Sequence, residues 1–377
     1  MDLPVEQSQP TVACGGRARD PVTSEMLVVM ALPKDPLEGA WMLDPPPRIA
    51  RPQFVVPVAV DPSGQRGPTY GQSRGPHWRR TSPNRFVPSD AIYDETTQRI
   101  VEVAAALPPD AAITGWASLR LAGAPYFDGR DHRMRELPVP VVAARGRHRR
   151  ELEGARVHRE GFRPDEIVHR LGARCTSVDR AIQDEMRHSD DVRLAVEVID
   201  MACHAQFTSL ARFGVYVDAA PRRVGMPTLR AALELASEGA QSRQEVQMRL
   251  IWEVDAGLPR PLCNPTLYSS SGRFLARPDL LDRVAGVVGE YDGIHHDADP
   301  QRGRDNTREQ RLRNHGLEYF AAVRGELAAK IMVPRMHAAR ARAATSRMPR
   351  AWTLVRPLHL TPELTLDEIL DRRPPPI

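Results

Sequence analysis

The sequence predicts an α/β protein, and three observations support this fold class. Helical stripes of apolar residues alternate with short apolar segments that have the length of strands. From residue 241 the order is a helix, a three-strand meander, a helix, a strand and a helix, which predicts an αβββαβ core. Proline is concentrated at the start of the chain. Changes in composition divide the chain into residues 1–75, 76–239, 240–345 and 346–377.

The first part is rich in proline. Residues 1–90 contain 15 of the 35 prolines, among them those of "DPPPRIARP" and "DPSGQRGPTYGQSRGP". Such a composition is typical of disordered segments, because few apolar side chains are available for burial. We therefore expect residues 1–75 to form a disordered lead, with one short strand at 53–60.

The second part is predicted to be a mostly helical α+β domain. Apolar residues recur at helical spacing in 94–107 and 112–125, and Thr114 is the expected N-cap of the latter helix. The segments "LPVPVVAARG" and "GARVHRE" are predicted strands, joined by a hairpin turn that contains the basic residues 145–150. Further amphipathic helices are expected at 176–189, 191–206 and 225–239.

The third part contains the predicted αβββαβ core. A helix at 241–259 ends at glycine and proline, and a first strand follows it before the turn "SSSG". The second and third strands are predicted at 273–281 and 286–292. A charged helix at 302–316, the strand "LEYFAAVRG" and a last helix complete the core, and residues 346–377 form a C-terminal tail.

Composition argues against several classes of protein. No apolar segment approaches the ~18–20 residues that span a bilayer, so we expect a cytoplasmic protein with no membrane partner. The four cysteines are far apart and form no CxxC pair, which argues against structural zinc and a disulfide framework. Every basic residue except Lys34 and Lys330 is arginine. Arginine suits bidentate contacts with phosphate, although a GC-rich genome also explains this preference.

Carboxylates converge on one predicted hairpin. If the strands pair about a turn at Val284 and Ala285, Asp279 lies opposite Glu290, with Asp292 two residues further along the same strand. Like charges held together in a partly buried site repel each other unless a cation lies among them. Oxygen-rich carboxylate sites suit Mg²⁺ or Mn²⁺, so this cluster predicts a metal site. The alternative is that the polar residues of "EYDG" only mark the end of a strand before a loop.

The combined pattern "RQEVQMRL…GRFLARPDLLD…VVGEYDGIHH…REQRLRNHGLEYFAAV" resembles the PD-(D/E)xK nuclease superfamily. Within that superfamily it is most similar to the group related to very-short-patch-repair (Vsr-like) endonucleases. The resemblance covers about residues 241–327 and implies a restriction-endonuclease-like fold for the core. It also implies that Asp279 and Glu290 are the ligands of a catalytic Mg²⁺ or Mn²⁺ ion.

The same resemblance assigns three further catalytic residues. Glu245 matches the helical acid of the family, although Ser242 and Glu245 also form a capping-box pattern that explains the glutamate structurally. Asp292 stands where the superfamily usually has lysine, and no lysine lies on the motif strands. His296 matches the histidine that closes the motif, and its ordinary pKa near 6.5 suits a general base.

A basic segment follows the motif. Residues 301–350 contain 12 basic and 4 acidic side chains, which is either a solvated helix face or a surface that follows nucleic-acid phosphates. Its arginines nearest the predicted site are Arg302, Arg304, Arg308 and Arg311.

Upstream, "RIVEVAAALPPDAAITGWASLRLAGAP" and "VDRAIQDEMR…AVEVIDMA" resemble actinobacterial proteins related to AbiEi-type abortive-infection antitoxins. A winged helix precedes this region in those proteins, and here only "WRRTSPNRFVP" is similar to the last strand of a wing. The sequence therefore predicts a metal-dependent endonuclease that hydrolyses phosphodiester bonds of nucleic acid, with DNA as the expected partner. The alternatives are a catalytically inactive, DNA-binding regulator of the antitoxin type and a structural interaction protein.

Overall fold

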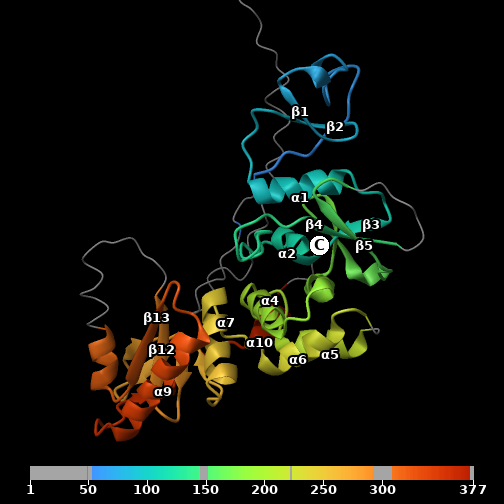
Figure 1. Ribbon diagram of the computed structural model, residues 1–377. Helices are drawn as coiled ribbons and strands as arrows, with labels where there is room; N and C mark the ends of the chain where they lie inside the picture. The colour runs from blue at the N-terminus through green and yellow to red at the C-terminus, as the bar shows by residue number, and fades with distance from the viewer. Residues whose placement is uncertain (1–48, 50–52, 145–151, 221–222, 293–307, 374–377) are drawn as a thin grey trace, which may run out of the picture.

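The computed structural model describes residue 49 and residues 53–144, 152–220, 223–292 and 308–373. This part of the chain is a mixture of α-helices and β-sheets (Figure 1). No helix in these ranges is both long enough and apolar enough to cross a membrane.

A small β-hairpin lies at the N-terminal end of the described chain. Strands β1 (Trp78–Ser82) and β2 (Arg85–Pro88) pair in antiparallel fashion, and Val58 forms a bridge with Phe86. Phe54 is fully buried, and the side chain of Gln98 makes hydrogen bonds of 2.8 and 3.0 Å with the backbone of Val55. The short strand expected at 53–60 is only an isolated bridge at Val58, and the described residues 53–75 of the expected disordered lead have a defined conformation. Residues 1–48 lie outside the described part.

A five-stranded sheet with the order β5-β4-β3-β7-β6 forms the centre of the second part. Strands β4 and β5 are parallel, so the hairpin predicted between them is wrong. Parallel neighbours require the chain to return to the same end of the sheet, which a tight turn cannot do. The basic residues 145–150 of this connection are outside the described residues. The strands are β3 (Ala111–Ile113), β4 (Val139–Ala143), β5 (Ala155–Arg159), β6 (Ile167–Arg170) and β7 (Ala173–Thr176).

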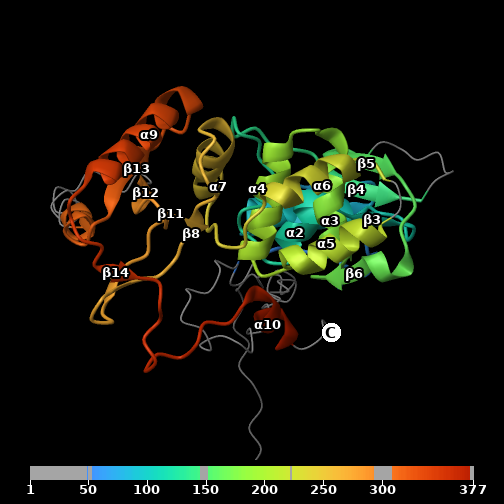
Figure 2. The ribbon, with the colours of Figure 1, turned by 90° about the horizontal axis from the view of Figure 1, so that it is seen from below.

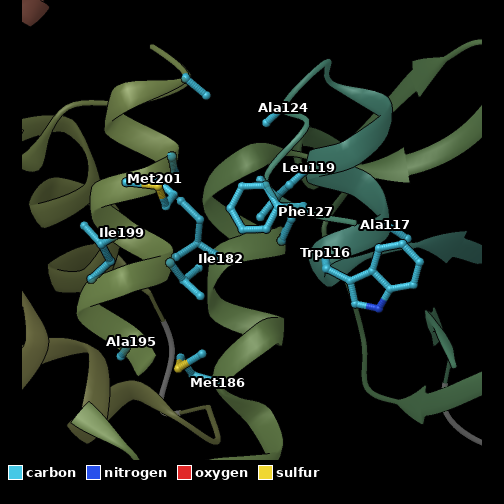
Figure 3. Packing of buried hydrophobic residues seen from close by; sticks show 14 of the residues in the cluster. Trp116, Ala117, Leu119, Ala124, Phe127, Ile182, Met186, Ala195, Ile199 and Met201 are labelled. Atoms are coloured by element: carbon cyan, nitrogen blue, oxygen red, sulfur yellow. The ribbon is translucent and has the colours of Figure 1, made fainter. Parts of the chain in front are cut away.

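Helices cover this sheet and form its hydrophobic core (Figure 1). Most begin at a residue whose side chain accepts a backbone N–H: Asp94 for α1, Ser177 for α3, Asp191 for α4 and Ser209 for α5. In Figure 3, side chains of α3 such as Ile182 lie between those of α2 and those of α4. The helices are α1 (Glu95–Ala105), α2 (Gly115–Leu121), α3 (Val178–Glu185), α4 (Val192–His204), α5 (Leu210–Ala219) and α6 (Met226–Leu235).

The third part contains a second sheet, with the order β13-β12-β11-β8. Strands β8, β11 and β12 are antiparallel neighbours, whereas β12 and β13 are parallel and are connected through helical residues 308–314. Helix α7 precedes this sheet and continues as a π-helical turn at Ile251–Asp255, and α9 follows it. The elements are α7 (Arg243–Leu250), β8 (Leu262–Cys263), β11 (Leu280–Asp282), β12 (Val287–Asp292), β13 (Glu318–Val323) and α9 (Ala329–Thr345).

The strand predicted at 273–281 is in fact two strands in different sheets. Residues Phe274–Ala276 form β10, which pairs with β9 (Leu267–Ser269), and β9 also pairs with β14 (Trp352–Thr353). Pro278 separates β10 from β11, and proline has no N–H to donate to a sheet ladder. The chain therefore leaves one sheet before Asp279 and enters the other after it.

The C-terminal tail and α7 both connect the two sheet-containing parts. Helix α10 (Leu366–Asp371) returns to α5, where Asp367 and Asp371 form ion pairs with Arg212 (Figure 2). Helix α7 lies beside α4 in both ribbon views, and Arg249 of α7 pairs with Asp200 of α4 at 2.7 Å. Both of these side chains are fully buried, so α7 is held firmly against the helical part.

Candidate metal centre

The hairpin of β11 and β12 sets the geometry of the site. Leu280 pairs with Gly289 and Leu281 with Val288, so one step further along the ladder places Asp279 beside Glu290. The backbone N–H of Tyr291 donates to a carboxylate oxygen of Asp279 at 2.7 Å. The predicted register is confirmed for the paired residues of β11 and β12, and Asp279 lies just before β11, beside Glu290 of β12.

The pKa of Asp279 is raised, partly by the charges of acids that lie near it. Burial, followed by the negative charges of Glu245 and Glu290, raises the pKa of Asp279 from 3.8 to about 7. The hydrogen bond from Tyr291 and the charge of Arg308 act in the opposite direction but are outweighed. Glu245 and Glu290 therefore lie close enough to Asp279 to interact with it. A cation would relieve their repulsion.

Glu290 is held by two side chains. It lies in the buried half of β12, with its side chain only 8% exposed. Arg308 contacts one carboxylate oxygen at 2.6 Å, and the hydroxyl of Tyr319 donates to the other at 3.3 Å. Tyr319 lies on the neighbouring strand β13, and its pKa is raised by burial and by the charge of Glu290. These contacts fix the orientation of the Glu290 carboxylate.

Glu245 caps helix α7, which agrees with the capping-box pattern that it forms with Ser242. Its backbone N–H donates to Ser242 Oγ at 3.2 Å, and its carboxylate accepts from Ser242 Oγ at 2.9 Å and from the N–H of Gln241 at 2.8 Å. These bonds cap the first turn of α7. The same carboxylate raises the pKa of Asp279, so capping and proximity to the site coexist in one residue.

Asn264 joins two of the acids, and the sequence analysis missed it. Its side-chain N–H donates to Glu245 at 2.6 Å, and its backbone N–H donates to the carbonyl of Asp279 at 3.0 Å. Its φ of 49° is left-handed, a conformation that asparagine adopts more readily than most residues. Asparagine directly before a proline was the available signal, but it indicates only a turn. Tyr319 was missed because an apolar strand gives no sign of which hydroxyl faces an acid.

The remaining predicted residues lie at the edge of the site or beyond the described residues. Asp292 is exposed at the end of β12, and its charge contributes to the raised pKa of Tyr319. Arg308 reaches Glu290, whereas Arg311 is exposed one turn later. His296, Arg302 and Arg304 fall in 293–307, outside the described residues.

Two carboxylates form the centre of the candidate metal site. Within the described ranges, no three His, Cys, Asp or Glu side chains are grouped so that they could hold a metal together. Mg²⁺ commonly binds through only one or two carboxylates, together with waters and substrate phosphates. Asp279 and Glu290 fit that mode, because Asp279 lies one step beyond the pair Leu280–Gly289, beside the buried Glu290, and its pKa is raised by burial and by the charges of neighbouring acids.

Replacing Asp279 with asparagine should change how stability depends on pH. A carboxyl whose folded pKa is raised to about 7 keeps its proton in the folded chain at pH 5, where the unfolded chain has lost it. Metal-free wild type should therefore lose more stability than Asp279→Asn as the pH rises from about 4 to 7. The stability of the variant minus that of wild type should be about 1–3 kcal/mol larger at pH 8 than at pH 4. Denaturant unfolding at several pH values measures this, and parallel profiles would refute it.

Comparison of the chain with protein-family models, with curated proteins and with solved structures gives no match in any of the three.

Proposed function

We propose that this chain is a metal-dependent endonuclease that hydrolyses phosphodiester bonds, with DNA as its substrate. One observation carries the proposal: Asp279, the residue before β11, lies beside the buried Glu290 of β12 and next to the arginine-bearing helix at 308–314. In metal-dependent phosphodiester hydrolysis a cation activates the water and polarises the phosphate, and positive side chains contact the nucleic-acid backbone. This region of the chain brings together residues suited to both tasks.

The topology and the sequence motif support the same activity. Helix α7, strands β8, β11 and β12, the helix at 308–314 and strand β13 have the αβββαβ order of a restriction-endonuclease-like core, with β9 and β10 of another sheet inserted between β8 and β11. The motif around Asp279 and Glu290 resembles the Vsr-like group of the PD-(D/E)xK superfamily.

Each residue then has a role in the proposed reaction. Asp279 and Glu290 would hold Mg²⁺ or Mn²⁺, oriented by Tyr291 N–H and the hydroxyl of Tyr319. Such an ion, when bound, lowers the pKa of water and polarises the phosphate. Among the described residues the sole lysine is Lys330, exposed on α9, so we propose His296 as the base that accepts the proton of the water.

A plasmid-nicking assay tests the proposal. Purified chain should convert supercoiled plasmid into nicked or linear DNA with Mg²⁺ or Mn²⁺, and a chelator should abolish the conversion. Single-stranded DNA, branched DNA and RNA of equal length identify the preferred substrate. Absence of cleavage on every substrate, in both metals, would contradict the proposed activity.

Binding to DNA should depend strongly on salt, because each neutralised phosphate releases condensed counterions. Replacing both Arg304 and Arg308 with glutamine should weaken binding to unrelated sequences about equally and flatten the slope of log K against log[salt] by up to about two. Fluorescence anisotropy at several salt concentrations, with Ca²⁺ in place of Mg²⁺, measures both quantities. An unchanged slope and affinity would identify the helix as a solvated face.

A catalytically inactive, DNA-binding regulator of the antitoxin type is the second candidate. The observation that favours it is the ion pair of Arg308 with Glu290, which supplies positive charge to this acid from the protein itself. The region upstream also resembles antitoxin-related proteins. Salt-dependent DNA binding without cleavage or metal binding would favour this function.

A further inference from the structure

The guanidinium of Arg308 contacts a proposed metal ligand. Its Nη2 atom lies 2.6 Å from Glu290 Oε1 and also donates to the carbonyl of Arg277 at 3.2 Å. The side chain of Glu290 is 8% exposed, whereas that of Arg308 is 46% exposed. The acid is therefore fixed in the sheet, and the arginine reaches it from the solvent side.

A divalent ion and this guanidinium compete for the same oxygen. A ligand oxygen lies about 2.1 Å from Mg²⁺, so an ion bound to Glu290 Oε1 would be within a few ångströms of Arg308. Two cations at that separation repel each other, and the repulsion is stronger in a partly dry site than in water. Arg308 can move away at little cost, because nearly half of its side chain is already in contact with solvent.

We propose that Arg308 occupies the position of the cation at Glu290 in the metal-free chain and is displaced when the ion binds. Before the ion arrives, the guanidinium contributes to the compensation of the buried charge of Glu290. After displacement, the same side chain lies on the solvent side of the site, where it can contact a substrate phosphate. This inference depends on the proposed function, because it requires metal at Asp279 and Glu290.

Metal titration of three arginine variants tests the displacement. Calorimetry with Mn²⁺ alone, without DNA, is carried out on metal-free wild type, Arg308→Gln, Arg308→Lys and Arg311→Gln. Arg308→Gln should bind Mn²⁺ about tenfold more tightly, since the competing ion pair with Glu290 is lost. Arg308→Lys should stay within about threefold of wild type because it keeps the charge. Arg311→Gln removes the same charge from the same helix, away from Glu290, and should change the affinity less than about twofold.

Thermal unfolding gives a second measurement. Without metal, Arg308→Gln should unfold at a lower temperature than wild type, and saturating Mn²⁺ should raise its Tm by more than it raises that of wild type. If wild type binds Mn²⁺ and Arg308→Gln binds it equally or more weakly, the displacement is refuted while the metal site stands. Equal tightening in Arg308→Gln and Arg308→Lys or Arg311→Gln would also refute it. If no chain binds Mn²⁺, the proposed function and this inference both fail.

Discussion

Replacing Asp279 with asparagine, or Glu290 with glutamine, is expected to reduce metal-dependent cleavage by about 10³-fold or more. Metal ions contribute several kcal/mol to stabilisation of the transition state, and each 1.36 kcal/mol corresponds to a factor of ten in rate. Both substitutions keep the size of the side chain and remove a charged ligand. Initial rates of plasmid nicking at saturating Mg²⁺ measure the effect.

The fold should survive these substitutions. The pKa of Asp279 is raised to about 7 by burial and by neighbouring acids, so the neutral amide removes repulsion and not a needed charge. Glu363→Gln is the matched control, since it breaks an exposed ion pair with Arg356 at 2.5 Å and should leave cleavage unchanged. If Asp279→Asn and Glu290→Gln both fail to fold, judged by circular dichroism and thermal unfolding, these acids are structural.

Replacing Arg249 with methionine is expected to destabilise the chain by about 3–5 kcal/mol. Arg249 and Asp200 are both fully buried and lie 2.7 Å apart, and Asp200 also accepts the N–H of Ser237 at 2.7 Å. Removing the arginine leaves a buried carboxylate whose pKa burial already raises to about 6. Because the pair joins α4 to α7, the loss should also loosen the helix that carries Glu245. Denaturant unfolding at pH 7 measures the change.

An exposed pair of equal length is the control for this prediction. Arg193 lies 2.7 Å from Asp255, but their side chains are 41% and 27% exposed. Arg193→Met should therefore lower stability by no more than about 1 kcal/mol, because solvent screens the pair. The double variant Asp200→Leu, Arg249→Met should recover part of the loss, since apolar residues often replace a buried ion pair without penalty. Equal losses of stability in Arg249→Met and Arg193→Met would show that burial of the ion pair does not determine the loss.

Local sequence patterns predicted helix caps and turns, because residues that are close in the sequence determine these features. The cap at Ser242 and the turn after Asp282 follow from nearby residues, and the turn sets the register that brings Asp279 to Glu290. The direction of β5 relative to β4 did not follow, because two short apolar strands carry no signal for parallel or antiparallel pairing. The contacts of Asn264 and Tyr319 with the acids span 19 and 29 residues, and no local pattern records them.

Calorimetric titration of metal-free chain with Mn²⁺ tests the metal centre most directly, because it needs neither a substrate nor turnover. We expect wild type to bind one ion per chain through Asp279 and Glu290. We expect Asp279→Asn to lose this binding while remaining folded. No binding to wild type, or equal binding to wild type and variant, would contradict the assignment of these two acids as metal ligands.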